Sequence, residues 1–103
     1  MLDHAREAVE LMRGKSRQNL DEDRLLQLSV VRLVEIVGEA AGRVTEPTQA
    51  LYSHIPWSEI IGTRHRLIHG YDFVDYDILW QTIQEDLPVL IRQLEQILES
   101  GQN

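Results

Sequence analysis

The residues best suited to chemistry gather in one stretch, residues 62–77, which reads GTRHRLIHGYDFVDYD. Arg64, His65, His69 and Tyr71 fall within eight consecutive positions of it, together with a second arginine. An arginine carries a planar, permanently charged group that fits phosphate oxygens, and a histidine can give or take a proton near neutral pH. Such a set fits phosphodiester chemistry that needs no metal or other cofactor.

The spacing of these residues predicts a helix that begins at Pro56 or Trp57, runs to His69 and stops at Gly70. On such a helix His65 and His69 share a face, because residues four apart are neighbours. Arg64 precedes His69 by five residues, about 140° around the axis, so it must reach around the helix or the last turn must be irregular. We expect His69 in that last turn, where the helix dipole favours its protonated form.

Two other interpretations of this cluster are open. Arginine and histidine are favoured near a helix C-terminus by the dipole alone, so the cluster could be a solvated helix end. Alternatively, His65 and His69 could bind a metal ion, with Asp72 or Asp75 as a third ligand. Arg66 argues against the metal, because its charge would oppose a nearby cation.

The elements that must position the cluster follow from helical spacing of apolar residues. A first helix ends at Gly14, and a second begins near Asn19 or Asp21 and runs to about Gly42, with Asn19 and Glu22 spaced for a capping box. The core stripe of the second helix recurs at a near-heptad spacing, at Leu26, Val30, Leu33, Val37 and Ala41. Leu25, Val31 and Val34 lie off this stripe, which predicts contact with a second subunit.

The remaining segments complete a helical bundle. Residues 46–56 indicate a short helix or turn, and Asp75 can cap a last helix that extends to about Ser100 with a kink at Pro88. Period-two alternation typical of strands is missing. The sequence therefore predicts one domain, residues 1–103, with an all-α fold: an up-down bundle of four to five helices.

Composition narrows the function further. The chain has 103 residues, no cysteine and a formal net charge of −7 at pH 7. Disulfide and thiolate chemistry are thereby excluded, and we expect a cytoplasmic protein because neither a signal peptide nor a membrane-spanning run is visible. The negative charge argues against a protein that coats nucleic acid, but it leaves room for a small basic site.

The motif and its flanking segments resemble one family. RHRLIHGY lies between PWSEIIG and VDYDILWQTIQEDLP, and VEIVGEAA stands on the earlier helix. Over about residues 20 to 98 this combination resembles the HepT-like branch of the HEPN superfamily, the toxin partners of minimal-nucleotidyltransferase antitoxins in bacteria and archaea. The resemblance implies a metal-independent ribonuclease that acts on RNA as a homodimer, with two motif helices facing each other across a cleft.

The resemblance also implies roles for individual residues. Arg64 and His69 match the catalytic pair, and Tyr71 matches the tyrosine that the antitoxin modifies with AMP. His65 matches a supporting polar position, which is asparagine in many relatives. A competing hypothesis is a catalytically inactive helical dimer that serves as a binding module for a nucleotidyltransferase, since fold alone does not guarantee activity.

Overall fold

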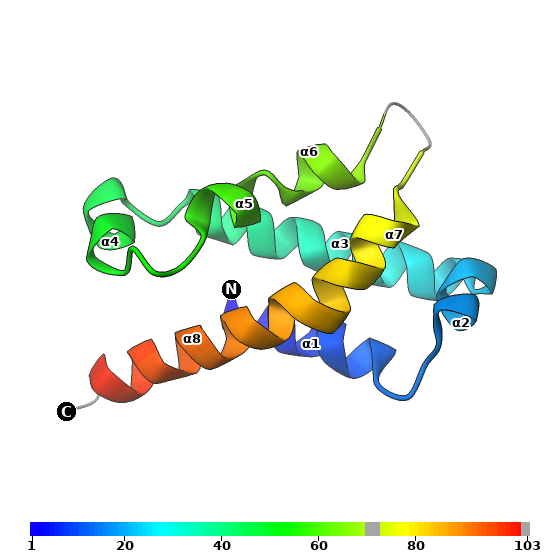
Figure 1. Ribbon diagram of the computed structural model, residues 1–103, viewed down its shortest axis with the longest axis horizontal. Helices are drawn as coiled ribbons and strands as arrows, with labels where there is room; N and C mark the ends of the chain where they lie inside the picture. The colour runs from blue at the N-terminus through cyan, green and yellow to red at the C-terminus, as the bar shows by residue number, and fades with distance from the viewer. Residues whose placement is uncertain (70–72, 102–103) are drawn as a thin grey trace.

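The computed structural model describes residues 1–69 and 73–101, and it confirms the all-α prediction. Figure 1 shows α3 (Arg24–Gly42) crossing the molecule, with α5 (Trp57–Ile61) and α6 (Thr63–Leu67) along one side of it. The other elements are α1 (Leu2–Met12), α2 (Arg17–Glu22), α4 (Glu46–Leu51), α7 (Tyr76–Gln81), the π-helix η1 (Thr82–Asp86) and α8 (Leu87–Gly101). None of the described helices is long and apolar enough to cross a bilayer.

The helix predicted to start at Asn19 or Asp21 is interrupted. Asp23 ends α2 and caps α3, because its carboxylate accepts a hydrogen bond of 3.1 Å from the Leu26 N–H. The capping box expected between Asn19 and Glu22 is wrong, since Ser16 and Asn19 form one instead. The backbone N–H of Asn19 donates to Ser16 Oγ at 3.1 Å, and that of Ser16 donates to Asn19 Oδ1 at 2.8 Å. A side-chain acceptor placed just before each helix thus sets both starts.

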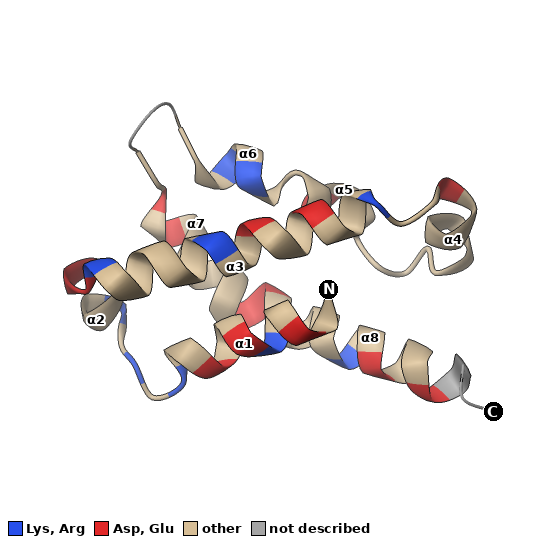
Figure 2. Ribbon diagram, turned by 180° about the vertical axis from the view of Figure 1, so that it is seen from behind, with Lys and Arg blue, Asp and Glu red and all other residues tan. Residues whose placement is uncertain are grey.

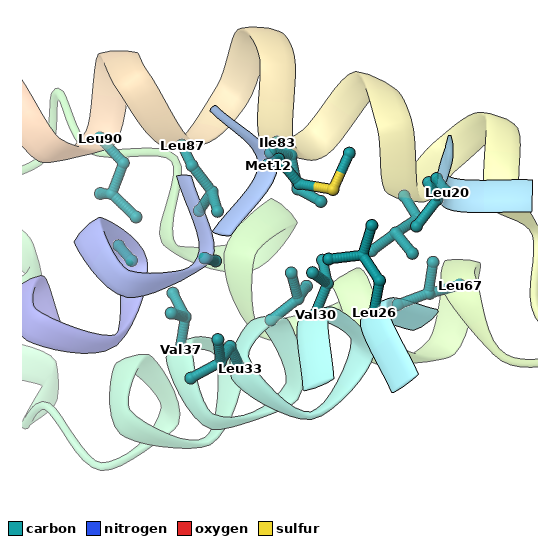
Figure 3. Close-up of a cluster of buried hydrophobic side chains, with 14 of the residues drawn as sticks. Met12, Leu20, Leu26, Val30, Leu33, Val37, Leu67, Ile83, Leu87 and Leu90 are labelled. Carbon is teal, nitrogen blue, oxygen red and sulfur yellow. The ribbon is translucent and has the colours of Figure 1, made fainter. Parts of the chain in front are cut away.

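The core lies between α3, α1 and the C-terminal helices, whose buried side chains face those of α3 (Figure 3). The predicted stripe of α3 is confirmed, because each of its residues is buried: Leu26, Val30, Leu33, Val37 and Ala41. Of the residues off the stripe, Val34 belongs to this same core, whereas Leu25 is 77% exposed. An apolar side chain therefore remains on the outer face of α3.

A close approach between α3 and α5 fixes the element that precedes the motif. A Cβ atom added at Gly38 would lie 3.1 Å from the carbonyl oxygen of Ile60, which is tighter than ordinary packing. The small residue thus lets the backbone of α5 rest directly on α3. The helix that approaches Gly38 so closely thus belongs to the same chain.

The last helical segment begins as predicted but is irregular before Pro88. Asp75 accepts hydrogen bonds of 3.1 Å from the N–H groups of Asp77 and Ile78, which confirms it as the cap. The irregularity is a π turn, in which the Leu87 N–H donates to the Thr82 carbonyl five residues earlier. Proline has no N–H to give to the preceding turn, so the ladder is altered on its N-terminal side.

Candidate functional site

The helix expected to carry the whole motif is shorter than predicted. It divides at Gly62 into α5 and α6, and α6 ends at Leu67. Thr63 is buried at this junction, where its hydroxyl donates to the Glu59 carbonyl at 2.9 Å. The prediction of one helix to His69 is therefore wrong.

A short loop replaces the last helical turn. Ile68 is extended and pairs with Val74 in an antiparallel bridge. The N–H of His69 donates to the Phe73 carbonyl at 2.8 Å, and the N–H of Asp75 donates to the Leu67 carbonyl at the same distance. These cross-loop bonds satisfy backbone groups that a longer helix would have paired internally.

His69 consequently lies beyond the helix, on the motif loop, which we define as the described residues 68–69 and 73–74. The prediction that it shares a helix face with His65 is wrong, and so is the argument that places it in the last turn beside the helix dipole. Both histidines are exposed, His65 on α6 and His69 on the loop. Tyr71 lies outside the described residues, together with Gly70 and Asp72.

The ring of His69 lies next to that of Phe73, a contact that the sequence did not predict. Its ring and that of Phe73 have centroids 6.0 Å apart, with the planes tilted by 55°. Phe73 is 61% exposed, so one side of its ring faces solvent. The available signal was an aromatic residue four positions after the histidine, which the backbone pairing of Ile68 with Val74 brings close to it.

Arg64 reaches across to α3. Its Nε donates to Glu35 Oε2 at 2.9 Å, and its side chain is 63% exposed against 16% for Glu35. Figure 2 shows the basic positions of α6 alongside acidic positions of α3. The arginine thus stands on the outer surface, next to the start of the motif loop.

Arg66 takes the other side of the same helix. Its Nη2 donates to the Thr63 hydroxyl at 3.3 Å. It also lines a cavity of about 170 Å³ between α3, α5 and the η1–α8 segment, together with three carboxylates, Glu59, Glu85 and Asp86. Partial burial raises the pKa of Asp86, and the neighbouring charge of Glu85 adds to the increase.

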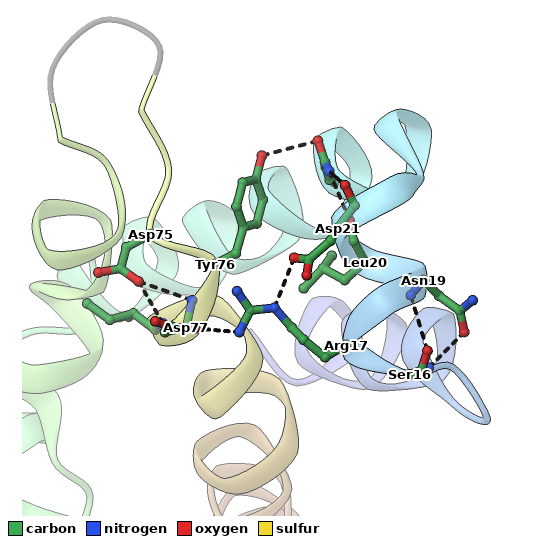
Figure 4. A network of polar contacts seen from close by, with 10 residues as sticks. Ser16, Arg17, Asn19, Leu20, Asp21, Asp75, Tyr76 and Asp77 are labelled. Atoms are coloured by element: carbon green, nitrogen blue, oxygen red, sulfur yellow. Dashed lines mark hydrogen bonds and ion pairs between the residues drawn. The ribbon is translucent and has the colours of Figure 1, made fainter.

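Polar contacts hold the exit of the motif loop to α2 (Figure 4). Arg17 donates to Asp21 at 3.0 Å and to Asp77 at 2.5 Å, and these two bonds raise the pKa of its guanidinium. Tyr76 donates from its hydroxyl to Gln27 Oε1 at 3.1 Å. The chain therefore leaves the loop through a residue anchored to a distant part of the sequence.

The described residues contain no group of three or more histidine, aspartate or glutamate side chains that could hold a metal ion. What they do contain is an exposed arginine near the start of the short helix α6 and an exposed imidazole on the loop that follows the helix. The molecule is thus a small helical bundle with an exposed arginine and an exposed histidine along one segment, residue types that are suited to phosphate chemistry.

Comparison with known proteins defines the family. The model of the family described as "Ribonuclease HepT-like" matches residues 1–97, and the chain belongs to this family. It is 37% identical over 100 residues to a Thermococcus cleftensis protein named "Probable ribonuclease HepT", covering 93% of this chain and 91% of that protein. The family assignment made from the motif is confirmed.

Two further relatives agree with this assignment. A Caldanaerobacter subterraneus protein named as a "Putative RNase" is 37% identical over 91 residues, which cover 88% of this chain and 81% of that protein. A Methanocaldococcus jannaschii protein with the same description is 28% identical over 95 residues, covering 92% of this chain and 87% of that protein. No solved structure matches the chain.

Proposed function

We propose that this protein is a metal-independent ribonuclease, in which the 2′-OH of RNA attacks the adjacent phosphate. The O2′–P bond forms while the P–O5′ bond breaks, which leaves a 2′,3′-cyclic phosphate and a 5′-OH. Arg64 would bind the charged phosphate, and His69 would transfer a proton to or from the reacting oxygens. His65, exposed on the same short helix, would support substrate binding.

One observation carries this proposal. The chain places an exposed imidazole on a loop that begins where the helix of an exposed arginine ends, and one cross-loop bond of 2.8 Å fixes the backbone of that histidine. Membership in the HepT-like family adds the substrate class. A solvated helix end would not require the histidine to be held beyond the helix.

The reaction needs both a base and an acid, yet each chain supplies one His69. A two-fold dimer would place a second imidazole opposite the first and so complete the site. Leu25 and Leu28 are 77% and 52% exposed on the outer face of α3, which gives such a dimer apolar surface to bury. We therefore include homodimerisation in the proposal.

The proposed regulation rests on Tyr71. A cytoplasmic minimal nucleotidyltransferase, acting as antitoxin, would transfer AMP from ATP to the phenol oxygen, with pyrophosphate leaving. The added phosphate would compete with RNA for nearby arginine and histidine side chains. Coexpression with a minimal nucleotidyltransferase should yield adenylylated Tyr71 in peptide mass spectra and an inactive protein, whereas Tyr71→Phe should stay active. Modification at another residue would refute this switch.

The central experiment incubates purified protein with an RNA oligonucleotide, with its DNA counterpart and with RNA carrying one 2′-deoxy position. Wild type should cut RNA in EDTA, spare DNA and spare the deoxy position, because only RNA has the nucleophile. His69→Ala should not cut. An inactive wild-type dimer that still binds the nucleotidyltransferase would favour the alternative, a binding module, which the outer face of α3 could equally serve.

A further inference from the structure

The most informative contact outside the proposed catalytic pair is the carboxylate that holds Arg64. Glu35 lies 29 residues earlier in the chain, on α3, and its Oε2 accepts the Nε–H of Arg64 at 2.9 Å. The carboxylate is the enclosed partner, 16% exposed against 63% for the arginine. The pair therefore has an inner anchor and an outer end that faces solvent.

The anchor itself has a rigid support. Glu35 is flanked on α3 by Val34 and Val37, which are 3% and 2% exposed in the core. One turn on, Gly38 is in close contact with the Ile60 carbonyl of α5. The backbone that carries the carboxylate is thus fixed by packing on both α1 and α5, and a side chain on rigid helices is positioned more accurately than one on a loop.

Arg64 contacts Glu35 through Nε, and this determines which of its N–H groups remain able to bind a substrate. A guanidinium carries five N–H groups in one plane, so a bond from Nε fixes the orientation of the whole fork. The two terminal nitrogens lie at its other end. Within residues 1–69 and 73–101 neither of them makes a hydrogen bond. Glu35 thus holds the guanidinium through Nε, and the N–H groups of the two terminal nitrogens remain able to bind an anion.

We propose that Glu35 is the positioning residue for Arg64, holding its guanidinium so that both terminal nitrogens face the scissile phosphate. This inference rests on the proposed function and extends it to a residue on a different helix. A long arginine side chain loses conformational entropy when it binds a substrate. Because the ion pair with Glu35 already orders this side chain in the free protein, less entropy is lost when the substrate binds. The gain is expected in the chemical step, where orientation counts most.

The chain supplies a matched control on the same helix. Arg32 and Glu39 form an ion pair at 3.3 Å on α3, one turn to either side of Glu35, with 59% and 48% of their side chains exposed. Glu39→Ala removes the same charge from the same helix, but the arginine it frees lies outside the motif. A general electrostatic effect on RNA binding would appear in both variants.

The kinetic experiment compares Glu35→Ala, Glu35→Gln and Glu39→Ala under steady-state conditions. Glu35→Ala should lower kcat by about 10- to 100-fold with a small change in KM, because misplacement of a substrate-binding group acts mainly on the transition state. Glu35→Gln keeps an acceptor for the Nε–H and should retain kcat within about threefold of wild type. Glu39→Ala should match wild type, and so should a Glu35→Ala variant if the inference is wrong.

A double variant and a spectroscopic signal separate this inference from the proposed function. Once Arg64→Ala is present, Glu35→Ala should cause no further loss, whereas an additional loss would show that Glu35 acts on something else. The Arg64 Nε–Hε NMR signal, identified by its absence in Arg64→Lys, should shift and broaden in Glu35→Ala. An unchanged signal overturns the positioning role even if that variant fails to cut. If wild type cuts no RNA while the signal responds as expected, the proposed function fails and the positioning contact stands.

Discussion

Two arginines on one short helix have opposite surroundings. Arg64 and Arg66 are two residues apart on α6, about 200° around its axis. Arg64 meets a single carboxylate and turns outward, whereas Arg66 lines a cavity that also holds Glu59, Glu85 and Asp86. A positive charge that shares a cavity with three carboxylates attracts phosphate weakly. We therefore expect Arg64 to bind substrate and Arg66 to contribute to structure.

The strongest test of this difference replaces each arginine in turn. Arg64→Ala should lower the rate of RNA cleavage by about 10²- to 10³-fold, the usual loss when a group that stabilises a charged transition state is removed. Arg66→Ala removes the same charge from the same helix and should stay within about threefold of wild type. Cleavage rates on one RNA oligonucleotide measure both.

Circular dichroism of both variants checks that α6 and its bundle remain folded. Equal losses in Arg64→Ala and Arg66→Ala would contradict the assignment of one functional side. They would instead indicate that α6 attracts RNA through its overall charge.

The overall fold and the motif of this protein could be predicted from its sequence alone. The spacing of apolar residues and the capping residues were sufficient to predict an all-α fold, because the core stripe of α3 and the Asp75 cap depend on local sequence. The motif was visible because Arg64 and His69 are unusual neighbours in an acidic chain. The break at Asp23 was missed because a continuous apolar stripe conceals a capping residue.

The site geometry was predicted less well, for a physical reason. Whether His69 continues a helix depends on two backbone hydrogen bonds across the loop: His69 donates to the Phe73 carbonyl, and Asp75 donates to the Leu67 carbonyl. Local helix propensity does not predict such bonds. The contact of Glu35 with Arg64 spans 29 residues in sequence and depends on how α3 packs against α6. Positions on one helix follow from spacing, whereas pairings between helices need the fold.

A smaller effect is expected at the aromatic that contacts His69. Phe73→Ala removes the ring whose centroid lies 6.0 Å from that of His69, and it should slow cleavage by about tenfold because the imidazole becomes less well oriented. Leu98→Ala, a truncation of another exposed apolar residue on α8, serves as the control. Single-turnover rates equal to wild type would show that the backbone alone positions His69.

The anchor at the exit of the loop should affect stability more than catalysis. Arg17→Ala removes ion pairs to both Asp21 and Asp77 and should lower the free energy of unfolding by about 1 kcal/mol, the upper range for exposed pairs. Arg13→Ala breaks one exposed pair with Glu10 and should cost about 0.3 kcal/mol. Urea denaturation measures both, and equal costs would mean that the link between α2 and α7 adds nothing.

The smallest expected effect is a change in stability with pH, caused by Asp86 in the cavity that Arg66 also lines. Partial burial and the charge of Glu85 raise the pKa of Asp86 in the folded state, so the folded protein binds a proton there more readily than the unfolded chain. Stability therefore falls as pH rises through this raised pKa, and the full penalty is present above it.

At pH 7, Asp86→Asn should raise the free energy of unfolding by up to about 0.5 kcal/mol, and the gain should disappear near pH 3, where the aspartate is protonated in both states. Glu99→Gln, an exposed change on α8, corrects for lowering the net charge of −7. If Asp86→Asn is less stable than this control at pH 7, the attraction of Asp86 to the positive charge of Arg66 outweighs the burial penalty, and this attraction stabilises the cavity side of α6.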